Sequence, residues 1–227
     1  RAFGEAGATL VISSRKAEAC EQAAEIVTRD TGSTCLPIAC HVGHWDQCDA
    51  MVETVYEKFD RIDVLVNNAG MSPLYESPAA VSRELFDKVI GVNLAGPYRL
   101  SAIVGEQMAR GEGGSIINVS SIAAVSPSAS ELPYAAAKAA LNNLTEGMAH
   151  TFGPKVRVNC IMPGAFLTDI SDAWSDEVKR AIEARVPLGR AAEPDEIVGV
   201  ALYLASDAGR YSNGAIIKVD GGAAYGS

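Results

Sequence analysis

The sequence predicts a doubly wound α/β fold, in which helices cover both faces of a parallel sheet. Short, continuously apolar runs alternate with helical segments along the whole chain. That alternation is typical of strands that are buried on both faces and connected by helices. No linker-like stretch divides the 227 residues. We therefore expect one domain over residues 1–227.

The elements of the first half follow from short patterns. The run "ATLVIS" (8–13) reads as a buried strand, and a polar helix follows it through about Arg29. The next expected strand is "STCLPIACHV" (33–42), and "DQCDAMVETVYEKF" (46–59) has the periodicity of an amphipathic helix. "IDVLVNN" (62–68) is a third strand, followed by a long helical pattern over 82–110.

The second half continues the alternation. Expected strands lie at 114–121, 156–164 and 215–222. A helix over 133–150 is rich in alanine, the strongest helix former, and a helix over 193–206 opens with Pro194. Small or polar clusters follow five of the strands: "SSR", "CHVG", "NNAG", "VSS" and "MPG". Ligands of such sheets bind beyond the carboxyl ends of the strands, so these clusters indicate a surface that a large ligand approaches closely.

Composition excludes several classes of function. The balance of 19 basic and 28 acidic residues gives a net charge of −9, which disfavours nucleic-acid binding. The five cysteines lack a C-x-x-C spacing, as expected for reduced thiols in a cytoplasmic protein. His41 and His44 lie near Cys40 and Asp46 without a second ligand pair, so we expect no metal. We find no signal peptide and no apolar run near 20 residues, and expect no membrane association.

Six motifs together carry a family resemblance. They are "NNAG" (67–70), Asn93 in "GVNLAG", Ser121 in "INVSS", "YAAAK" (134–138), "RVNCIMPG" (157–164) and "VDGG" (219–222). In this order they resemble the classical short-chain dehydrogenase/reductase (SDR) family over essentially the whole chain. Within the family, "VISSRK", "CHVG" and "SSIAAVSPS" look closest to NADPH-dependent carbonyl reductases of the SDR member 4 type.

The resemblance implies a Rossmann-type fold and an oxidoreductase acting on a small-molecule ketone or secondary alcohol. It implies a homotetramer, in which the helices over 82–110 and 133–150 pair across a two-fold axis. Apolar residues of these helices agree with that assembly: Leu100, Ile103, Val104, Leu141 and Leu144. The implied catalytic tetrad is Asn93, Ser121, Tyr134 and Lys138. The implied cofactor contacts are Ser14, Arg15, His41, Val42, Asn67, Asn68, Ala69, Gly70, Tyr134, Lys138, Pro163, Gly164, Phe166 and Thr168.

Tyr134 and Lys138 suit this chemistry physically. Four residues apart on a helix, they share one face. Reduction of a carbonyl leaves negative charge on its oxygen, which needs a proton donor. A cation about 5 Å from the phenol oxygen favours phenolate by roughly 3 kcal/mol at an effective dielectric of about 20, on the order of two pKa units before burial opposes it. Ser121 can donate to the substrate oxygen; taken alone, it fits a turn or a helix cap equally well.

Asn93 and Pro97 form a second pairing. Pro97 has no N–H, so the Asn93 carbonyl loses the partner that a regular helix would supply. In the family this backbone oxygen is thought to hold a water that links Lys138 to solvent. A proline kink without a functional role is the alternative.

The end of the first apolar run bears on cofactor choice. NAD enzymes generally place an acidic residue there, to bind the adenosine ribose. Here the run ends Ser14-Arg15-Lys16, and the first carboxylate is Glu18. Arg15 can fork onto a 2′-phosphate and Ser14 can add a hydrogen bond, so we expect NADP(H), with NAD(H) as the alternative. Arg15 and Lys16 could equally be solvated loop residues.

The chain departs from the family in two places. The family's first strand and its T-G-x-x-x-G-x-G loop are missing from the chain, and we expect about 25 to 30 preceding residues. Without a central strand, two strands should be left unpaired across a gap. His41 stands where the family usually has an aspartate that contacts adenine, which leaves the backbone of Val42 for that role.

Substrate identity stays open among several classes. Residues 165–190 are expected to form a lid, with Phe166, Leu167 and Trp174 as pocket residues. A 3-oxoacyl-carrier-protein reductase would use a basic patch to bind its acidic carrier, and Lys179, Arg180, Arg185 and Arg190 are candidates. A sugar or polyol dehydrogenase is a further alternative within the same chemistry. A non-catalytic dinucleotide-binding regulator is the alternative from a different class.

Overall fold

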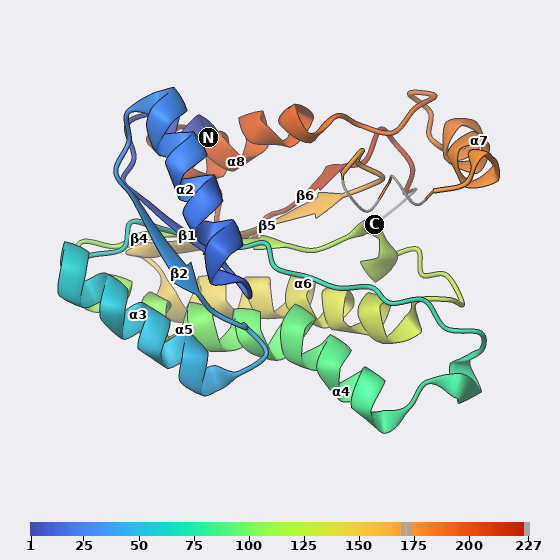
Figure 1. The fold of residues 1–227 in the computed structure, drawn as a ribbon, viewed down its shortest axis with the longest axis horizontal. Coiled ribbons are helices and arrows are strands. Elements are labelled where there is room, and N and C mark those ends of the chain that lie inside the picture. Colours follow the sequence, from blue (N-terminus) through green and yellow to red (C-terminus); the bar gives the residue numbers. More distant parts are fainter. Residues whose placement is uncertain (169–170, 172–173, 225–227) are drawn as a thin grey trace.

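The computed structural model describes residues 1–168, 171 and 174–224. Within them, parallel strands lie between two layers of helices, as predicted (Figure 1). The strands are β1 (Leu10–Ser14), β2 (Cys35–Ala39), β3 (Val64–Asn67), β4 (Gly114–Val119), β5 (Val156–Pro163) and β6 (Ile216–Val219). Each lies inside the range that the sequence predicts, or differs from it by one residue.

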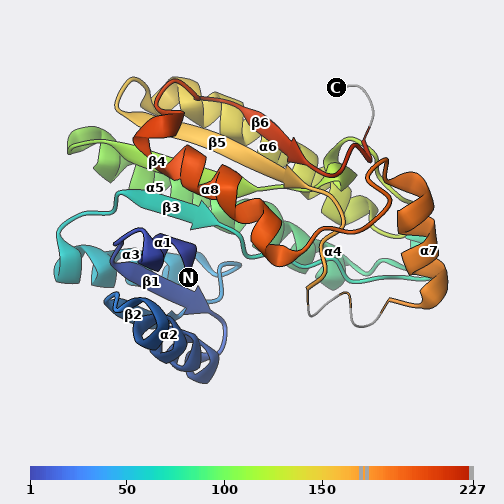
Figure 2. The ribbon, with the colours of Figure 1, turned by 90° about the horizontal axis from the view of Figure 1, so that it is seen from above.

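Helices cover both faces of the strands (Figures 1 and 2). One layer contains α1 (Ala2–Glu5), α2 (Ala17–Thr31) and α8 (Val198–Ala205). The opposite layer contains α3 (Trp45–Phe59), α4 (Arg83–Ile90), α5 (Gly96–Arg110) and α6 (Leu132–Phe152). Helix α7 (Asp176–Arg185) lies apart from both layers, beyond the end of β5 (Figure 1). None of the described helices is long and apolar enough to cross a membrane.

The strands form two sheets rather than one. β1 pairs with β2, and β3 to β6 pair in sequence order, but β1 and β3 are not hydrogen-bonded to each other (Figure 2). Val11 and Val66 on these two strands are 37% and 40% exposed, although strands of this kind are normally buried on both faces. The expectation of two unpaired strands is therefore confirmed.

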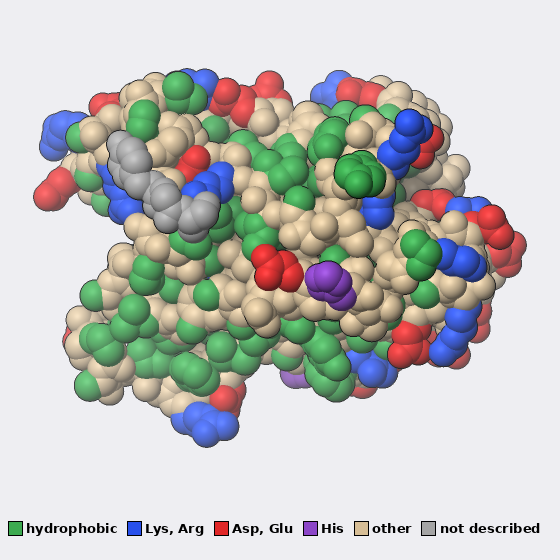
Figure 3. Space-filling model, turned by 180° about the vertical axis from the view of Figure 1, so that it is seen from behind, with side chains coloured by type: hydrophobic (Ala, Val, Ile, Leu, Met, Phe, Trp, Pro, Cys, Tyr) green, Lys and Arg blue, Asp and Glu red, His purple; other side chains and the backbone are tan. Residues whose placement is uncertain are grey.

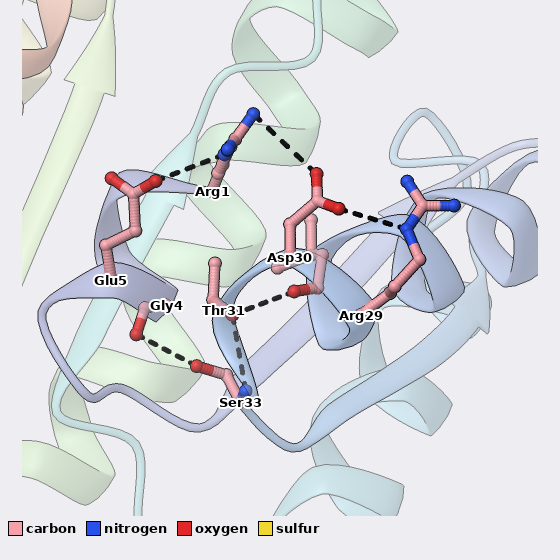
Figure 4. Close-up of polar contacts among 8 residues, drawn as sticks. Arg1, Gly4, Glu5, Arg29, Asp30, Thr31 and Ser33 are labelled. Carbon is pink, nitrogen blue, oxygen red and sulfur yellow. Dashed lines mark hydrogen bonds and ion pairs between the residues drawn. The ribbon is translucent and has the colours of Figure 1, made fainter.

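A cluster of polar contacts at the amino-terminal end joins α1 to the end of α2 and to Ser33, which lies between α2 and β2 (Figure 4). Ser33 Oγ donates to the Gly4 carbonyl at 2.9 Å, and its backbone N–H donates to Thr31 Oγ1 at 3.2 Å. Arg1 pairs with Glu5 at 3.1 Å and with Asp30 at 3.6 Å. Exposed ion pairs stabilise little, so the Ser33 contacts carry most of this attachment.

The helix predicted over 82–110 is interrupted. Ser82 caps α4 by accepting from the Leu85 N–H at 3.1 Å, but residues Gly91–Ala95 then form a π-helical turn before α5 begins at Gly96. Pro97 in the first turn of α5 cannot donate to Asn93, which explains why the regular α-helical ladder stops there. Insertions of this kind are frequent at functional sites.

The apolar residues expected to pair subunits are part of this chain's own core. Leu100, Val104 and Leu141 are buried, and the first two belong to a cluster that contains Ile116 and Val158 of the sheet. Other apolar side chains of the same layer remain exposed: Phe86 on α4, Tyr98 on α5 and Leu132 on α6.

Candidate active site

The predicted tetrad gathers at the carboxyl ends of β3 and β4. Ser121 follows β4, Tyr134 and Lys138 lie on α6, and Asn93 lies in the π-helical turn. Lys138 Nζ is 5.6 Å from the centroid of the Tyr134 ring. A Cβ built on Gly70, just after β3, would lie 3.1 Å from Asn93 Oδ1 and 3.6 Å from Lys138 Nζ. Three segments distant in sequence therefore meet around Gly70, where a side chain would crowd Asn93.

Lys138 is held by the end of β4. Its side chain is buried, and Nζ donates to the Val119 carbonyl at 2.8 Å. Burial lowers the pKa of Lys138 from 10.5 to about 8, because a desolvated ammonium is disfavoured, while the nearby Cys160 acts in the opposite direction. At neutral pH the ammonium remains charged. The Val119 carbonyl carries no signal in the sequence, because any residue would supply the same atom.

Tyr134 is partly buried, and its phenol is held in the neutral form. Burial raises the pKa of Tyr134 above 10; the hydrogen bond of the Ser121 side chain lowers it, and the charge of Glu131 adds to the rise. The expected lowering by Lys138 is therefore wrong in direction for this structure. Desolvation is the largest cause of the rise, and Lys138 Nζ lies over the ring and bonds to Val119. The result is a protonated phenol, which is the form that donates.

Ser121 combines a structural contact with a free donor. It is the N-cap of the 3-10 turn Ile122–Ala124, and its Oγ accepts from the Ala123 N–H at 3.1 Å. A hydroxyl that accepts one hydrogen bond still has its own hydrogen to donate. The cap and the catalytic interpretation of Ser121 are therefore compatible.

Asn93 is fully buried, and its side chain is committed to its neighbours. Nδ2 donates to the carbonyls of Met71 and Val89 at 2.8 and 2.9 Å, and Oδ1 accepts from the Met71 N–H at 3.2 Å. The Asn93 side chain therefore fastens the loop after β3 to the π-helical turn. Only backbone atoms of Met71 take part, so the role of this residue could not be predicted from its side chain.

Asn67 differs from the other residues of the "NNAG" motif. Its Nδ2 donates to Ser101 Oγ and to Asn118 Oδ1, each at 2.9 Å, and Asn118 in turn donates to Thr145 at 2.9 Å. The Asn67 side chain therefore faces the core and joins β3 to β4, α5 and α6. The predicted cofactor contact is thereby restricted to its backbone. The residues that follow it are exposed at the carboxyl end of β3: Asn68, Ala69 and Gly70.

Ser14 is the last residue of β1 and Arg15 follows it, so both lie at the carboxyl end of the strand. Arg15 is exposed, and within the described part of the chain its side chain makes no ion pair. Ser14 contacts Cys20 of α2: Oγ lies 3.2 Å from Cys20 Sγ, which also accepts from the Ser14 N–H at 3.0 Å. The buried Cys20 thus orients Ser14, a role that an isolated cysteine in the sequence does not reveal.

His41 and Val42 follow β2. His41 Nδ1 accepts from the Gly43 N–H at 3.1 Å, and the ring packs edge-on to His44 with centroids 4.7 Å apart. His41 is therefore turned onto its own loop. The Val42 side chain packs against the core, so only its backbone is placed for an adenine contact. No group of three metal-binding side chains occurs among the residues that the structure describes.

The segment after β5 completes the edge. The Gly164 N–H donates to the Val219 carbonyl at 3.0 Å, and a Cβ on Gly164 would lie 2.8 Å from Asp220 Cα, so a larger residue cannot be accommodated. Pro163 is the last residue of β5, and Phe166 and Thr168 follow it. Phe166 forms a bridge to Ala192, which ties the start of the predicted lid to its end.

The predicted lid contains α7, and Trp174 is partly buried, whereas residues 169–170 and 172–173 lie outside the described residues. Figure 3 shows the surface hollowed between the regions of α4 and α7, with apolar side chains gathered on the α4 side. A shallow recess on that side is lined by Pro73, Tyr75, Leu85, Val89, Glu131, Pro133 and Tyr134. Its lining is mainly apolar, and it includes the phenol of the tetrad.

These features fit a dinucleotide. Backbone is exposed at the carboxyl end of β3, an exposed guanidinium follows β1, and glycines allow close approach after β3 and β5. A proton donor and a buried ammonium stand beside the same edge. The arrangement is that of an oxidoreductase with a Rossmann-type fold, whose ligands bind beyond the carboxyl ends of the strands.

Comparison with known proteins gives the family. Residues 1–224 match the family model described as Enoyl-(Acyl carrier protein) reductase. The chain is 36% identical over 223 residues to 3-oxoacyl-[acyl-carrier-protein] reductase FabG of Chlamydia trachomatis, covering 98% of the chain and 90% of that protein. It is 34% identical over 225 residues to human dehydrogenase/reductase SDR family member 4, covering 98% and 81%. The chain belongs to the short-chain dehydrogenase/reductase family.

A solved structure agrees with the fold. Gluconate 5-dehydrogenase from Burkholderia cenocepacia, determined in complex with NADP and tartrate, superposes with a TM-score of 0.91 at 31% identity. The match covers 98% of this chain and 88% of that one. The Rossmann-type fold, the family and its oxidoreductase chemistry on CH–OH groups are confirmed.

Proposed function

We propose that this protein transfers a hydride between NADP(H) and a ketone or secondary alcohol, with Tyr134 as the acid/base group. The supporting observation is the pairing on α6 of a phenol with a raised pKa and a buried ammonium beside the ligand edge. The nicotinamide, when bound, supplies or accepts the hydride. The residues of the chain bind the carbonyl oxygen and move its proton.

Each residue of the tetrad has a distinct task in reduction. The Ser121 hydroxyl donates to the carbonyl oxygen, and the neutral Tyr134 phenol transfers its proton as that oxygen gains charge. The ammonium of Lys138, still charged at neutral pH, then stabilises the phenolate that remains. Asn93 fixes the loop after β3, and its backbone oxygen, which Pro97 cannot pair, is offered to the water that returns the proton. Alcohol oxidation uses the same groups in reverse.

A deuterium-transfer experiment tests this function. The full chain is incubated with NADPH that carries deuterium on both C4 positions and a panel of ketones of modest size. We expect mass spectrometry of the alcohol product to show one deuterium on the carbinol carbon. Turnover without deuterium in the product, or no turnover with ketones, sugars and 3-oxoacyl thioesters alike, would contradict the proposal.

NADP(H) is proposed over NAD(H) because of β1. Arg15 is exposed and makes no ion pair within the described residues, so its guanidinium is available for a 2′-phosphate. Ser14 beside it keeps a hydroxyl that is oriented by Cys20. No carboxylate occupies the positions directly after β1 that would bind an unphosphorylated ribose.

Among substrate classes, we propose ketones of modest size, because the apolar side chains of Leu85, Val89 and Pro133 lie beside Tyr134. The basic patch expected for an acyl carrier protein is weakened. Arg190 forms a bidentate pair with Glu196 at 2.6 and 2.7 Å, and Arg185 donates to Ser126 at 2.7 Å. A sugar or polyol dehydrogenase remains the second candidate, because the structural neighbour acts on gluconate by its name.

Two further properties belong to the proposal. We propose a homotetramer in which Phe86, Tyr98 and Leu132 are covered by neighbouring subunits, since all three are large apolar side chains left exposed on one layer. We also propose a cytoplasmic location, because all five cysteines are free thiols.

A further inference from the structure

Tyr75 connects the loop after β3 to the helix that carries the candidate acid. Its hydroxyl donates to the Ala129 carbonyl at 3.0 Å and accepts from the Leu132 N–H at 2.7 Å. Leu132 is the first residue of α6, and Tyr134 lies two residues further along. A single phenol therefore binds both the turn before α6 and the first helical N–H.

In the described chain, the N-cap residue of α6 does not cap the helix with its side chain. The first N–H groups of a helix have no partner within it, and a side-chain oxygen normally supplies one. Glu131 occupies the N-cap position but accepts no hydrogen bond from the helix; its carboxylate accepts from Ser128 Oγ at 3.2 Å. Pro133 has no N–H. Within the described residues, the cap of α6 thus comes from Tyr75, far away in sequence.

Asn93 of the tetrad holds the other end of the loop that carries Tyr75. Met71 is bonded to Asn93 through both its N–H and its carbonyl, and Tyr75 follows four residues later. The short segment 71–75 therefore links the π-helical turn to the start of α6. Tyr75 and Tyr134 also line the same recess.

We propose that Tyr75 is a positioning residue for the reaction: by capping α6 it holds the Tyr134 phenol between Ser121 and Lys138. This inference rests on the proposed function. Tyr75 itself transfers no proton. Because misplacement of a reacting group by about 1 Å can lower a rate by about 100-fold, loosening the first turn should affect turnover far more than cofactor binding.

The test is Tyr75→Phe in the full chain, which keeps the ring in the recess and removes both hydrogen bonds. We expect kcat per NADPH-binding site to fall by about ten-fold or more, with the dissociation constant of NADPH within about two-fold. Tyr211→Phe is the matched control, because Tyr211 is a fully exposed tyrosine outside the site, and it should leave kcat unchanged. Unchanged kcat per site in Tyr75→Phe, with or without a loss of folded protein, would overturn the proposal.

A second variant tests the capping route. Ser is a strong N-cap residue, so Glu131→Ser gives α6 a local cap. Tyr75→Phe should then lower kcat several-fold less in the Glu131→Ser background than in the wild type, and equal losses would overturn the proposal. Tyr134→Phe, measured in parallel, separates the two hypotheses. If Tyr134→Phe retains turnover, the proposed function fails; if it is inactive while Tyr75→Phe is fully active, only the positioning role fails.

Discussion

Burial moves the pKa values of Tyr134 and Lys138 in opposite directions. Desolvation disfavours whichever form is charged, so the phenol is kept protonated while the ammonium loses its proton more easily. At neutral pH the phenol can donate and Lys138 still carries the charge that stabilises the phenolate left behind. The pair therefore suits reduction, because the phenol must still carry its proton in order to donate it.

The lowered pKa of Lys138 predicts a pH-dependent stability. Its pKa is about 8 in the fold and 10.5 as the reference value, so between these values the unfolded chain binds more protons and stability rises with pH. The free energy of unfolding of the wild type, relative to Lys138→Met, should increase by up to about 3 kcal/mol from pH 8 to pH 10.5. Urea unfolding of both proteins measures it. A difference that stays flat or falls over this range would contradict the burial account.

Arg15 predicts the cofactor preference. Charge-assisted hydrogen bonds contribute roughly 1.5–3 kcal/mol each, so Arg15→Ala should lower kcat/KM with NADPH by about ten-fold or more and change it little with NADH. Lys16→Ala, which alters the neighbouring cation, is the matched control and should have the smaller effect. A wild-type preference for NADH, or equal losses with the two cofactors, would defeat the NADP(H) assignment.

At the scale of elements, periodicity was sufficient for most of the fold. β5 extends over Val156–Pro163 against a prediction of 156–164, and α3 begins one residue before its predicted start. Pro97 predicted that the helix over 82–110 loses the hydrogen bond to Asn93, but not that Gly91–Ala95 form a π-helical turn in which Asn93 also binds the distant backbone of Met71. Such contacts involve backbone atoms, which every residue shares.

The candidate site, like the fold, could be predicted from the sequence only in part. The family resemblance predicted the tetrad positions, and the four-residue spacing of Tyr134 and Lys138 predicted that these two share one helix face. Asn67 was placed with the cofactor because a motif does not tell which asparagine faces inward, whereas the alternation along β3 directs its side chain to the core. Tyr75 escaped notice because its partners lie more than fifty residues away in the chain.

The buried network of Asn67, Asn118 and Thr145 joins β3, β4 and α6, so breaking it should lower the free energy of unfolding. Asn118→Ala removes one hydrogen bond each from Asn67 and Thr145, which keep their bonds to Ser101 and Leu141. A net contribution of about 0.5–1.5 kcal/mol per hydrogen bond predicts that the free energy of unfolding falls by about 1–3 kcal/mol. Asn143→Ala, at an exposed position on α6, is the control. Equal losses from the two substitutions in urea unfolding would show that the network contributes little.

At the scale of the whole molecule, each chain leaves large apolar side chains uncovered. Leu100, Val104 and Leu141 are already buried in the chain's own core, so the tetramer that we propose would form through other side chains. Phe86, Tyr98 and Leu132 are exposed by about two fifths on the layer of α4, α5 and α6. Because all three are large and apolar and lie on one layer, they are the candidates for the interface of the proposed tetramer.

Light scattering tests the assembly. We expect the full protein at micromolar concentration to have four times the mass of its chain, and Phe86→Glu to shift the population to smaller species by placing a charge in the contact. Thr54→Glu, an exposed substitution on α3, should leave the mass unchanged. A stable wild-type monomer would refute the tetramer.

The central claim is that the Tyr134 phenol supplies the proton of the reaction. Tyr134→Phe removes one oxygen and keeps the ring beneath Lys138, so it tests that claim most directly. The measurement pairs kcat for ketone reduction with the dissociation constant of NADPH. The account predicts that turnover falls to background while NADPH binding stays within a few-fold, because the phenol acts on the proton rather than on affinity. Retention of more than about a tenth of the wild-type kcat would contradict it.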